Sequence, residues 1–481
     1  MNTELRTGLT FDDVLLVPEL SDIAPDDVSL KTKLAKNIVL NNPILSAGMD
    51  TVTESKMAIA VARQGGVGII HRNMSIEQQA TEVDKVKRSE HGVITDPFSL
   101  SQNNYVYEAN ELMGKYHISG VPITESGKLI GIITNRDLRF ESDHNKKIYE
   151  VMTKDNLITT PEGTTIEEAK AILTKYKIEK LPIVDSKMRL KGLITIKDIE
   201  KQIKYPESAK DTNGRLLAGA IIGSSGDFLE RAAELIKMKV DIVVIDSLHG
   251  HHTSIIEAVR AFKKQFSGVP LVAGNVATAR GALALIEAGA DCIKVGMGSV
   301  SNSATRMYTG VGVPQITAIQ DVYSSVKAYD IPIISDGGIK FSGDITKALA
   351  AGASTVMMGS MFAGCDESPG CFELFEWRKY KVYNTPDPAT YQSGTSKQQD
   401  VTRRITPDGP EGRILSRGPL ADTAKQLMSG VRTGMAYLGC RDLHKLRENA
   451  SFVRVTAAGL RESHSHDPIL GKNSQSYGDL L

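Results

Sequence analysis

Short apolar runs that end in glycine or aspartate alternate with helical patterns along most of this chain. The run IVVID at 242–246 is one example, and a helical pattern such as FLERAAELI at 228–236 separates it from the run before it. Continuous apolar runs of this length are typical of parallel strands buried on both faces. Eight such strands are predicted, at 43–46, 67–70, 219–222, 242–246, 271–274, 292–295, 331–336 and 355–359.

Eight strand–helix units are the number found in a (β/α)8 TIM barrel, so the predicted fold class is α/β with such a barrel. An open doubly wound sheet is the alternative. The chain has 481 residues, enough for a barrel and a second domain. The alternation of predicted strands and helices stops near residue 91 and resumes further along the chain. This predicts a first barrel part at 1–91, an inserted module at 92–204 and a second barrel part at 205–481.

The interruption contains a degenerate internal repeat. Ile118–Thr124 (ISGVPIT) is echoed by Ile178–Val184 (IEKLPIV), and Gly131–Asp137 (GIITNRD) is echoed by Gly192–Asp198 (GLITIKD). A repeated segment of this kind predicts two similar structural units that pack together. The two copies resemble a tandem CBS pair, also called a Bateman module.

Composition excludes several classes of function. Lys and Arg together number 57, as do Asp and Glu, so the formal net charge is zero and gives no electrostatic reason to expect a nucleic-acid or membrane partner. No apolar run of about 18 residues is present, and the N-terminus does not have the layout of a signal peptide. The four cysteines show neither metal-ligand spacing nor a disulfide framework. A cytoplasmic protein is predicted.

The stretch Lys294–Gln315 reads KVGMGSVSNSATRMYTGVGVPQ, a buried strand followed by a loop of small and hydroxyl residues. A glycine-rich turn at the carboxyl end of a strand lets a ligand approach the backbone closely. KVGxG, Thr-Arg and TGVGVPQ resemble the catalytic loop of the IMP dehydrogenase and GMP reductase family. The resemblance covers nearly the whole chain and implies an NAD(P)-dependent purine nucleotide oxidoreductase.

The resemblance also implies binding residues. Asp336 matches a residue that holds the ribose hydroxyls of the nucleotide, and a carboxylate is a good acceptor for a diol. Asp246 matches the residue that binds the nicotinamide ribose of NAD. The nucleotide-binding residues implied are Ser301, Asp336, Gly337, Gly338, Gly359, Ser360, Tyr383 and Asp408, and those implied for NAD or NADP are Asp246, Gly296 and Gly298.

The chain departs from the family pattern at the residues that perform the reaction in the family. The family's cysteine nucleophile is replaced by Ser303. A cysteine ionises at about pH 8.5, whereas a serine needs an adjacent base, and the loop offers neither His nor Lys. The Arg-Tyr pair of the family's flap is absent between Tyr383 and Asp408, while Thr305 and Asp408 match a Thr–carboxylate proton relay. The catalytic candidates are therefore Ser303, Thr305 and Asp408. Cys365 is expected to be a small buried residue rather than a relocated nucleophile.

Further expectations come from the resemblance alone. A K+ site is implied at Gly298, Glu462, Ser463 and His464. Adenine or guanine nucleotides are implied as regulators of the CBS pair, with contacts at Thr134, Asp137, Thr195 and Asp198. The implied assembly is a homotetramer or an octamer. Two functions stay open: an IMP dehydrogenase-like enzyme with altered chemistry, or a catalytically silenced nucleotide-binding paralogue that regulates purine nucleotide metabolism.

Overall fold

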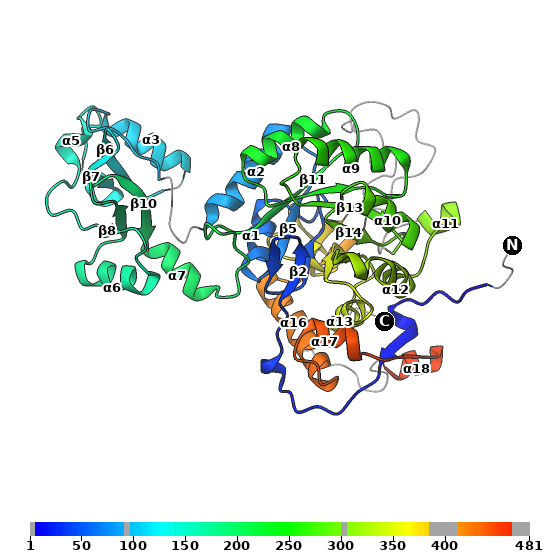
Figure 1. Cartoon of the computed structure of the whole chain (residues 1–481). Coiled ribbons are helices and arrows are strands. Elements are labelled where there is room, and N and C mark those ends of the chain that lie inside the picture. Colours follow the sequence, from blue (N-terminus) through cyan, green and yellow to red (C-terminus); the bar gives the residue numbers. More distant parts are fainter. Residues whose placement is uncertain are drawn as a thin grey trace. The chain divides into compact units, whose positions relative to one another are not determined.

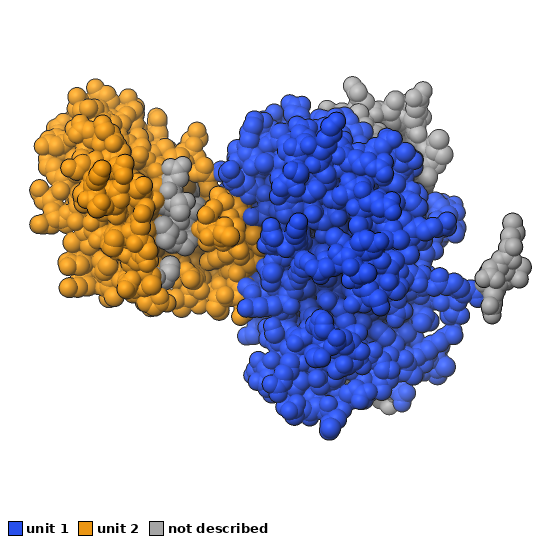
Figure 2. All heavy atoms as spheres, viewed as in Figure 1, with its two compact units in different colours: residues 1–84, 218–481 blue, residues 85–217 orange. Residues whose placement is uncertain are grey.

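The computed structural model describes residues 5–90, 97–116, 118–139, 141–299, 305–383 and 412–463. The chain forms two compact units (Figure 2), one of residues 1–84 with 218–481 and the other of residues 85–217. The module boundaries expected at residues 92 and 204 both lie inside the second unit. The assignment of that unit to a CBS pair stays a prediction.

Eight parallel strands of the first unit close into a barrel (Figure 1). The ring closes where β16 pairs with β4, with Val356 opposite Ile44. The predicted barrel is confirmed, and the open-sheet alternative is wrong. The strands, in their order around the barrel, are β11 (Ala218–Ile222), β12 (Ile242–Asp246), β13 (Leu271–Val276), β14 (Cys292–Val295), β15 (Ile333–Asp336), β16 (Thr355–Met358), β4 (Ile44–Ser46) and β5 (Val67–Ile70).

The strands are apolar because both of their faces are buried. All four apolar residues of β12, from Ile242 to Ile245, are inaccessible to solvent, since one face meets the barrel interior and the other meets the surrounding helices. The strand expected to start at Ile331 begins at Ile333 instead. It starts directly after Pro332, which has no N–H group to donate to the sheet.

A ring of helices covers the barrel (Figure 1), and glycines allow some of them to pack closely. A Cβ atom on Gly68 of β5 would lie 2.3 Å from the Cα of Ala58 in α1, so this contact requires glycine. No helix among the described residues is both long and apolar enough to cross a bilayer. The main helices of this unit are α1 (Ser55–Arg63), α2 (Ile76–Ser89), which runs on into the second unit, α8 (Phe228–Lys237), α9 (Thr253–Gln265), α10 (Ala279–Glu287), α12 (Gln315–Val326), α13 (Ser342–Ala350) and α16 (Leu420–Tyr437).

Shorter elements complete the first unit. β1 (Val14–Leu16) pairs with β20 (Phe452–Arg454), and β2 (Thr32–Ala35) forms a hairpin with β3 (Ile38–Leu40). A separate three-stranded antiparallel sheet contains β17 (Phe372–Phe375), β18 (Arg378–Tyr383) and β19 (Gly412–Leu415). The remaining short helices among the described residues are η1 (Phe11–Asp13), η2 (Pro25–Asp27), α11 (Thr305–Thr309), η3 (Lys327–Tyr329), α14 (Ser360–Ala363), α17 (Leu443–Asn449) and α18 (Ala457–Glu462).

The second unit contains two similar halves, as the internal repeat predicts. In each half two antiparallel strands are followed by a helix whose N-cap is a threonine, Thr134 in one and Thr195 in the other. Each half has its own apolar cluster. The halves contain α3 (Val106–Tyr116), β6 (Gly120–Glu125), β7 (Lys128–Thr134), α4 (Asn135–Leu138) and α5 (Ile148–Val151), then β8 (Thr160–Pro161), α6 (Ile166–Tyr176), β9 (Lys180–Val184), β10 (Leu190–Thr195) and α7 (Ile196–Lys204).

A buried lysine joins the two ends of the second unit. Lys87, near its first residue, donates from Nζ to the carbonyl of Leu216, near its last, at 2.9 Å. The same ammonium forms an ion pair with Asp211 at 3.0 Å, and its side chain is 3% exposed. The unit therefore holds its own ends together through a charge-assisted contact.

Candidate active site

The barrel mouth, at the carboxyl ends of the strands, contains a buried ammonium between two carboxylates. Lys294 of β14 contacts Asp246 at the end of β12, with 2.9 Å from Nζ to Oδ1, and also contacts Oδ2 of Asp336 at the end of β15. Asn275 donates from Nδ2 to the same Oδ2 at 2.9 Å. Strand ends that meet at one edge of the barrel therefore bring these side chains together.

The charges of this cluster stabilise one another. Burial lowers the pKa of Lys294, but the Asp246 and Asp336 carboxylates outweigh it and raise the pKa above that of an ordinary lysine. Burial raises the pKa of Asp246, and the Lys294 ammonium opposes that rise. Each carboxylate uses one oxygen for Lys294, and the other makes no hydrogen bond to the residues that the structure describes. Two carboxylate oxygens therefore remain for ligand hydroxyls at the mouth.

The ends of β14 and β15 lie in direct contact, and Gly296 makes this possible. A Cβ atom there would lie 2.2 Å from the carbonyl oxygen of Asp336, and the residue has φ +156°. Ser299 donates from Oγ to that carbonyl at 2.9 Å, and Gln315 donates from Nε2 to the carbonyl of Val295 at 2.9 Å. The family-like loop is therefore anchored to the strand that carries Asp336.

Arg306 ties the two flanks of the same loop. Its Nε donates to the carbonyl of Met297 at 3.0 Å, and its Nη2 donates to the carbonyl of Val313. A Cβ atom on Gly298, which has φ +70°, would lie 2.6 Å from Cγ of Arg306. Gly298 was predicted to admit a cofactor, and the arginine side chain gives it a packing role as well. Thr305, a catalytic candidate, begins α11 beside this arginine.

The predicted phosphate-binding residues lie on the turns after β15 and β16. Gly337 and Gly338 have φ of +91° and +82°, the left-handed region that glycine adopts without strain. Gly359 follows β16, and a Cβ atom on it would lie 3.0 Å from the hydroxyl of Tyr383. That hydroxyl donates to the sulfur of Met49 at 3.7 Å. The structure therefore brings Gly359, the adjacent Ser360 and Tyr383 together, although Tyr383 comes from the separate sheet.

Several predicted residues lie outside the described part of the chain or in other places. Ser301, Ser303, Asp408 and His464 belong to the undescribed residues. Glu462 and Ser463, the described members of the predicted K+ site, stand at the end of α18, where Ser463 donates from Oγ to the carbonyl of Gly459 at 2.9 Å. Cys365 is fully buried, and burial raises its pKa to about 11. The prediction that Cys365 is buried is confirmed.

The four predicted regulatory residues of the second unit bond to one another in pairs. Thr134 donates from Oγ1 to Oδ2 of Asp137 at 2.7 Å, and Thr195 donates to Oδ2 of Asp198 at 2.5 Å. Both pairs lie at helix N-termini, where such side chains stabilise the first turn. This capping explains the residues structurally, and their binding role stays a prediction.

Sequence reasoning missed three residues at the mouth. Lys294 was assigned only to a strand, although a lysine inside an otherwise apolar, doubly buried strand is a signal of a buried ion pair. Asn275 follows Gly274 within β13, and no sequence motif marks it as a site residue. His71 follows β5, is 4% exposed, accepts from the backbone N–H of Asn73 at 3.1 Å and lies 3.5 Å from Glu54. Burial lowers its pKa.

Comparison with known proteins identifies the class. Residues 8–466 match the family model described as IMP dehydrogenase / GMP reductase domain. The chain is 55% identical over 476 residues to the inosine-5'-monophosphate dehydrogenase of Halalkalibacterium halodurans, and 55% identical over 478 residues to that of Bacillus subtilis, covering 98% of each chain in both cases. GMP reductase C318A from Trypanosoma brucei, solved with guanosine 5'-monophosphate, superimposes with a TM-score of 0.86 at 35% identity, over 96% of this chain and 98% of that one.

The fold and these matches define a (β/α)8-barrel oxidoreductase of purine nucleotides. The chain belongs to the IMP dehydrogenase / GMP reductase family, as the resemblance of its loop predicted.

Proposed function

We propose that the barrel mouth binds a purine nucleoside 5'-monophosphate together with NAD or NADP, and that the redox chemistry differs from the family pattern because Ser303 stands at the nucleophile position. The observation that carries the binding proposal is the pair of carboxylates, Asp246 and Asp336, held by one buried Lys294 with an oxygen left on each. Two fixed acceptors suit two ribose diols, one in the nucleotide and one in the cofactor.

In this proposal Asp336 accepts hydrogen bonds from the nucleotide ribose. The phosphate of the nucleotide accepts hydrogen bonds from backbone N–H groups of the Gly337–Gly338 and Gly359–Ser360 turns. Ser301 and Tyr383 also contact this phosphate in the proposal. Asp246 accepts hydrogen bonds from the nicotinamide ribose. Gly296 has no side chain, so the dinucleotide can approach the backbone closely there. The cofactor, when bound, supplies the hydride acceptor. Lys294 holds both carboxylates in place.

Calorimetry with IMP, XMP, GMP and AMP tests the binding site. At least one of them binds to the native chain, and Asp336→Ala weakens that binding by about 1.5–3 kcal/mol, the range for a hydrogen bond to a charged group. Asp26→Ala, a change to an exposed carboxylate outside the mouth, leaves the affinity unchanged. Failure of all four nucleotides to bind the native chain would contradict the proposal.

A second function, a silenced nucleotide-binding paralogue, is favoured by one specific observation. The thiol position holds Ser303 and the flap lacks its Arg-Tyr pair, whereas the carboxylates for the two riboses are present. Incubation of the chain with IMP and NAD, followed by NADH absorbance, separates the two functions. An altered enzyme, in which Thr305 and Asp408 move the proton, turns over a purine nucleotide slowly, and a silenced paralogue binds without turnover.

Regulation, ion dependence, assembly and location are also part of the proposal. The second unit binds adenine or guanine nucleotides at Thr134, Asp137, Thr195 and Asp198, a role compatible with their capping contacts. Gly298, Glu462, Ser463 and His464 provide K+ ligands, and exchange of K+ for Na+ in the turnover assay tests this. The protein acts in the cytoplasm as a homotetramer or an octamer.

A further inference from the structure

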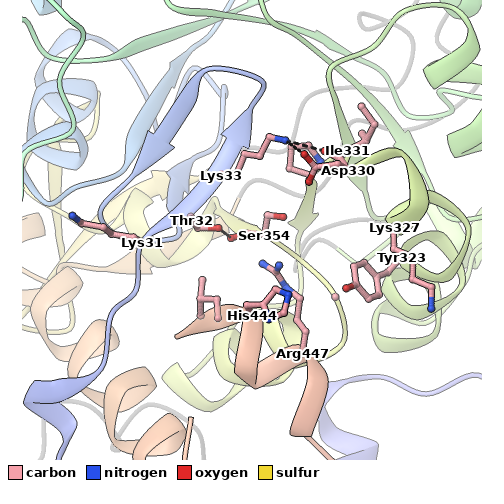
Figure 3. Close-up of a pocket in the computed structure, with 13 residues that line it drawn as sticks. Lys31, Thr32, Lys33, Tyr323, Lys327, Asp330, Ile331, Ser354, His444 and Arg447 are labelled. Carbon is pink, nitrogen blue, oxygen red and sulfur yellow. Dashed lines mark hydrogen bonds and ion pairs between the residues drawn. The ribbon is translucent and has the colours of Figure 1, made fainter. Parts of the chain in front are cut away.

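A polar cavity of about 330 Å3 lies at the edge of the barrel opposite the candidate active site. Its walls include Pro332, which precedes β15, and Ser354, which precedes β16, whereas Asp336 stands at the other end of β15. Thr32 of β2 and Arg447 of α17 complete the inner wall (Figure 3). The cavity therefore belongs to the amino ends of the strands and shares no residue with the mouth.

Positive charge predominates around this cavity. Lys31, Lys33, Lys327 and Arg447 line it, against one carboxylate, Asp330. Lys33 forms an ion pair with Asp330, which Figure 3 shows at one side of the cavity. Lys31 and Lys327 are exposed and form no ion pair with any residue that the structure describes. Three of the four cations are therefore not neutralised by protein carboxylates.

Arg447 is the innermost of these cations, and its guanidinium is incompletely bonded. Nη2 donates to the carbonyl of Ala353 at 3.3 Å, but the buried Nε has no hydrogen-bond partner among the described residues. Burial lowers the pKa of this arginine, which marks the cost of removing its charge from water. A half-buried cation with a buried, unused donor is destabilising unless an anion compensates it.

The rest of the wall includes the ring of Tyr323 and the hydroxyl of Thr32. The ring of Tyr323 is packed against Gly352, where a Cβ atom would lie 2.3 Å from Cγ of the ring. Thr32 donates from Oγ1 to the carbonyl of Ser354 at 2.7 Å, so its hydroxyl oxygen keeps lone pairs but no free proton. In Figure 3 the guanidinium of Arg447 points toward Ser354, with Tyr323 to one side.

We propose that this cavity is a binding site for a phosphate-bearing anion, with the half-buried Arg447 as the anchor and Lys31 and Lys327 as flanking charges. An arginine fork suits phosphate because several N–H groups can meet its oxygens at once. A volume of about 330 Å3 accommodates inorganic pyrophosphate or the phosphates of a nucleotide. The proposal does not depend on the function proposed for the barrel mouth.

Calorimetric titration of the full chain with inorganic pyrophosphate tests the site, and a variant changed only at the cavity separates this binding from binding at the mouth. Lys31→Glu combined with Lys327→Glu reverses two exposed charges that form no ion pair with the described residues, so we expect the variant to fold. This double variant weakens pyrophosphate binding by about tenfold or more, and Arg447→Gln does the same if it folds. Lys425→Glu reverses an exposed lysine of α16 that does not line the cavity, and it leaves the binding unchanged.

A parallel titration with ADP distinguishes the sources of the phosphate. If the component of ADP binding that the double variant removes is tighter than pyrophosphate binding, a nucleotide is the ligand and Tyr323 contacts its nucleoside part. If the two affinities are equal, the phosphates alone are recognised. The proposal is overturned if the native chain binds no pyrophosphate at millimolar concentration, or if the double variant and Lys425→Glu bind it equally well.

Discussion

At position 303 this chain has a serine, where the resemblance to its family implies a cysteine nucleophile. We propose that this difference prevents a covalent purine adduct, because an unactivated serine has almost no alkoxide at neutral pH. The carboxylates that would hold the two riboses are nevertheless present and fixed by Lys294. At the residue scale, we therefore expect nucleotide binding and covalent chemistry to be separable in this chain.

Ser303→Cys is expected to restore adduct formation more readily than turnover. An electrophilic purine nucleotide should increase the mass of the variant, as measured by intact-mass spectrometry, and should leave the native chain unchanged. Turnover of IMP by the variant stays low, because hydrolysis of the adduct also needs the Arg-Tyr pair that the flap lacks. Rapid NADH production from IMP by the native chain would show that turnover does not need a thiol at position 303.

Alkylation should distinguish the four cysteines. In the native protein at pH 8, iodoacetamide modifies Cys371, which is exposed, and spares the buried Cys292, Cys365 and Cys440. Burial raises the pKa of Cys365 to about 11, so little thiolate exists at that pH. Peptide mass spectrometry measures the sites, and denatured protein, in which all four react, is the control. Modification of native Cys365 as fast as Cys371 would mark it as a reactive thiol.

At the scale of elements, the contact between the ends of β14 and β15 aligns the loop with Asp336. Gly296→Ala introduces a Cβ atom 2.2 Å from the carbonyl oxygen of Asp336 at a backbone conformation that alanine rarely adopts. We expect loss of nucleotide binding and a destabilisation of roughly 1–3 kcal/mol, measured by denaturant unfolding. Gly343→Ala in α13 is the matched control, since nothing lies within 4 Å of its Cβ position.

Unchanged stability and affinity in Gly296→Ala would mean that the two strand ends separate easily. The control should be neutral or slightly stabilised, because alanine in a helix reduces the entropy of the unfolded chain.

The sequence predicts the elements well and the contacts between them poorly. Apolar runs such as 242–246 gave all eight barrel strands, because burial on both faces leaves a continuous pattern. The Lys294 cluster was not predicted, because its partners come from strands far apart in sequence, and only barrel closure brings them together. The cavity at Arg447 has the same origin, since Thr32, Tyr323 and Arg447 belong to three separate segments. Ser303 and Asp408 lie outside the described residues, so their roles rest on the resemblance alone.

For the whole molecule we expect a homotetramer that forms octamers when nucleotides bind the second unit. The expectation follows from the family to which the barrel belongs and from the two similar halves of the second unit. Light scattering at micromolar concentration, with and without ATP or GTP, measures the assembly. Asp137→Ala together with Asp198→Ala should abolish any nucleotide-dependent change, although each loses a helix cap. A monomer under every condition would contradict the expectation.

The contacts of Lys87 with Leu216 and Asp211 influence the order in which this chain folds. β5 and β11 are neighbours in the barrel, yet residues 71–217 separate them along the chain. The second unit, residues 85–217, lengthens this connection about tenfold, which adds roughly 2 kcal/mol of loop-closure entropy to the step that pairs these strands. If the second unit folds first, the contacts of Lys87 hold the two ends of that unit together. The barrel strands on either side then pair as they would across a short connection. The rate of barrel formation would then depend on Lys87, which lies neither at the barrel mouth nor in the cavity at Arg447.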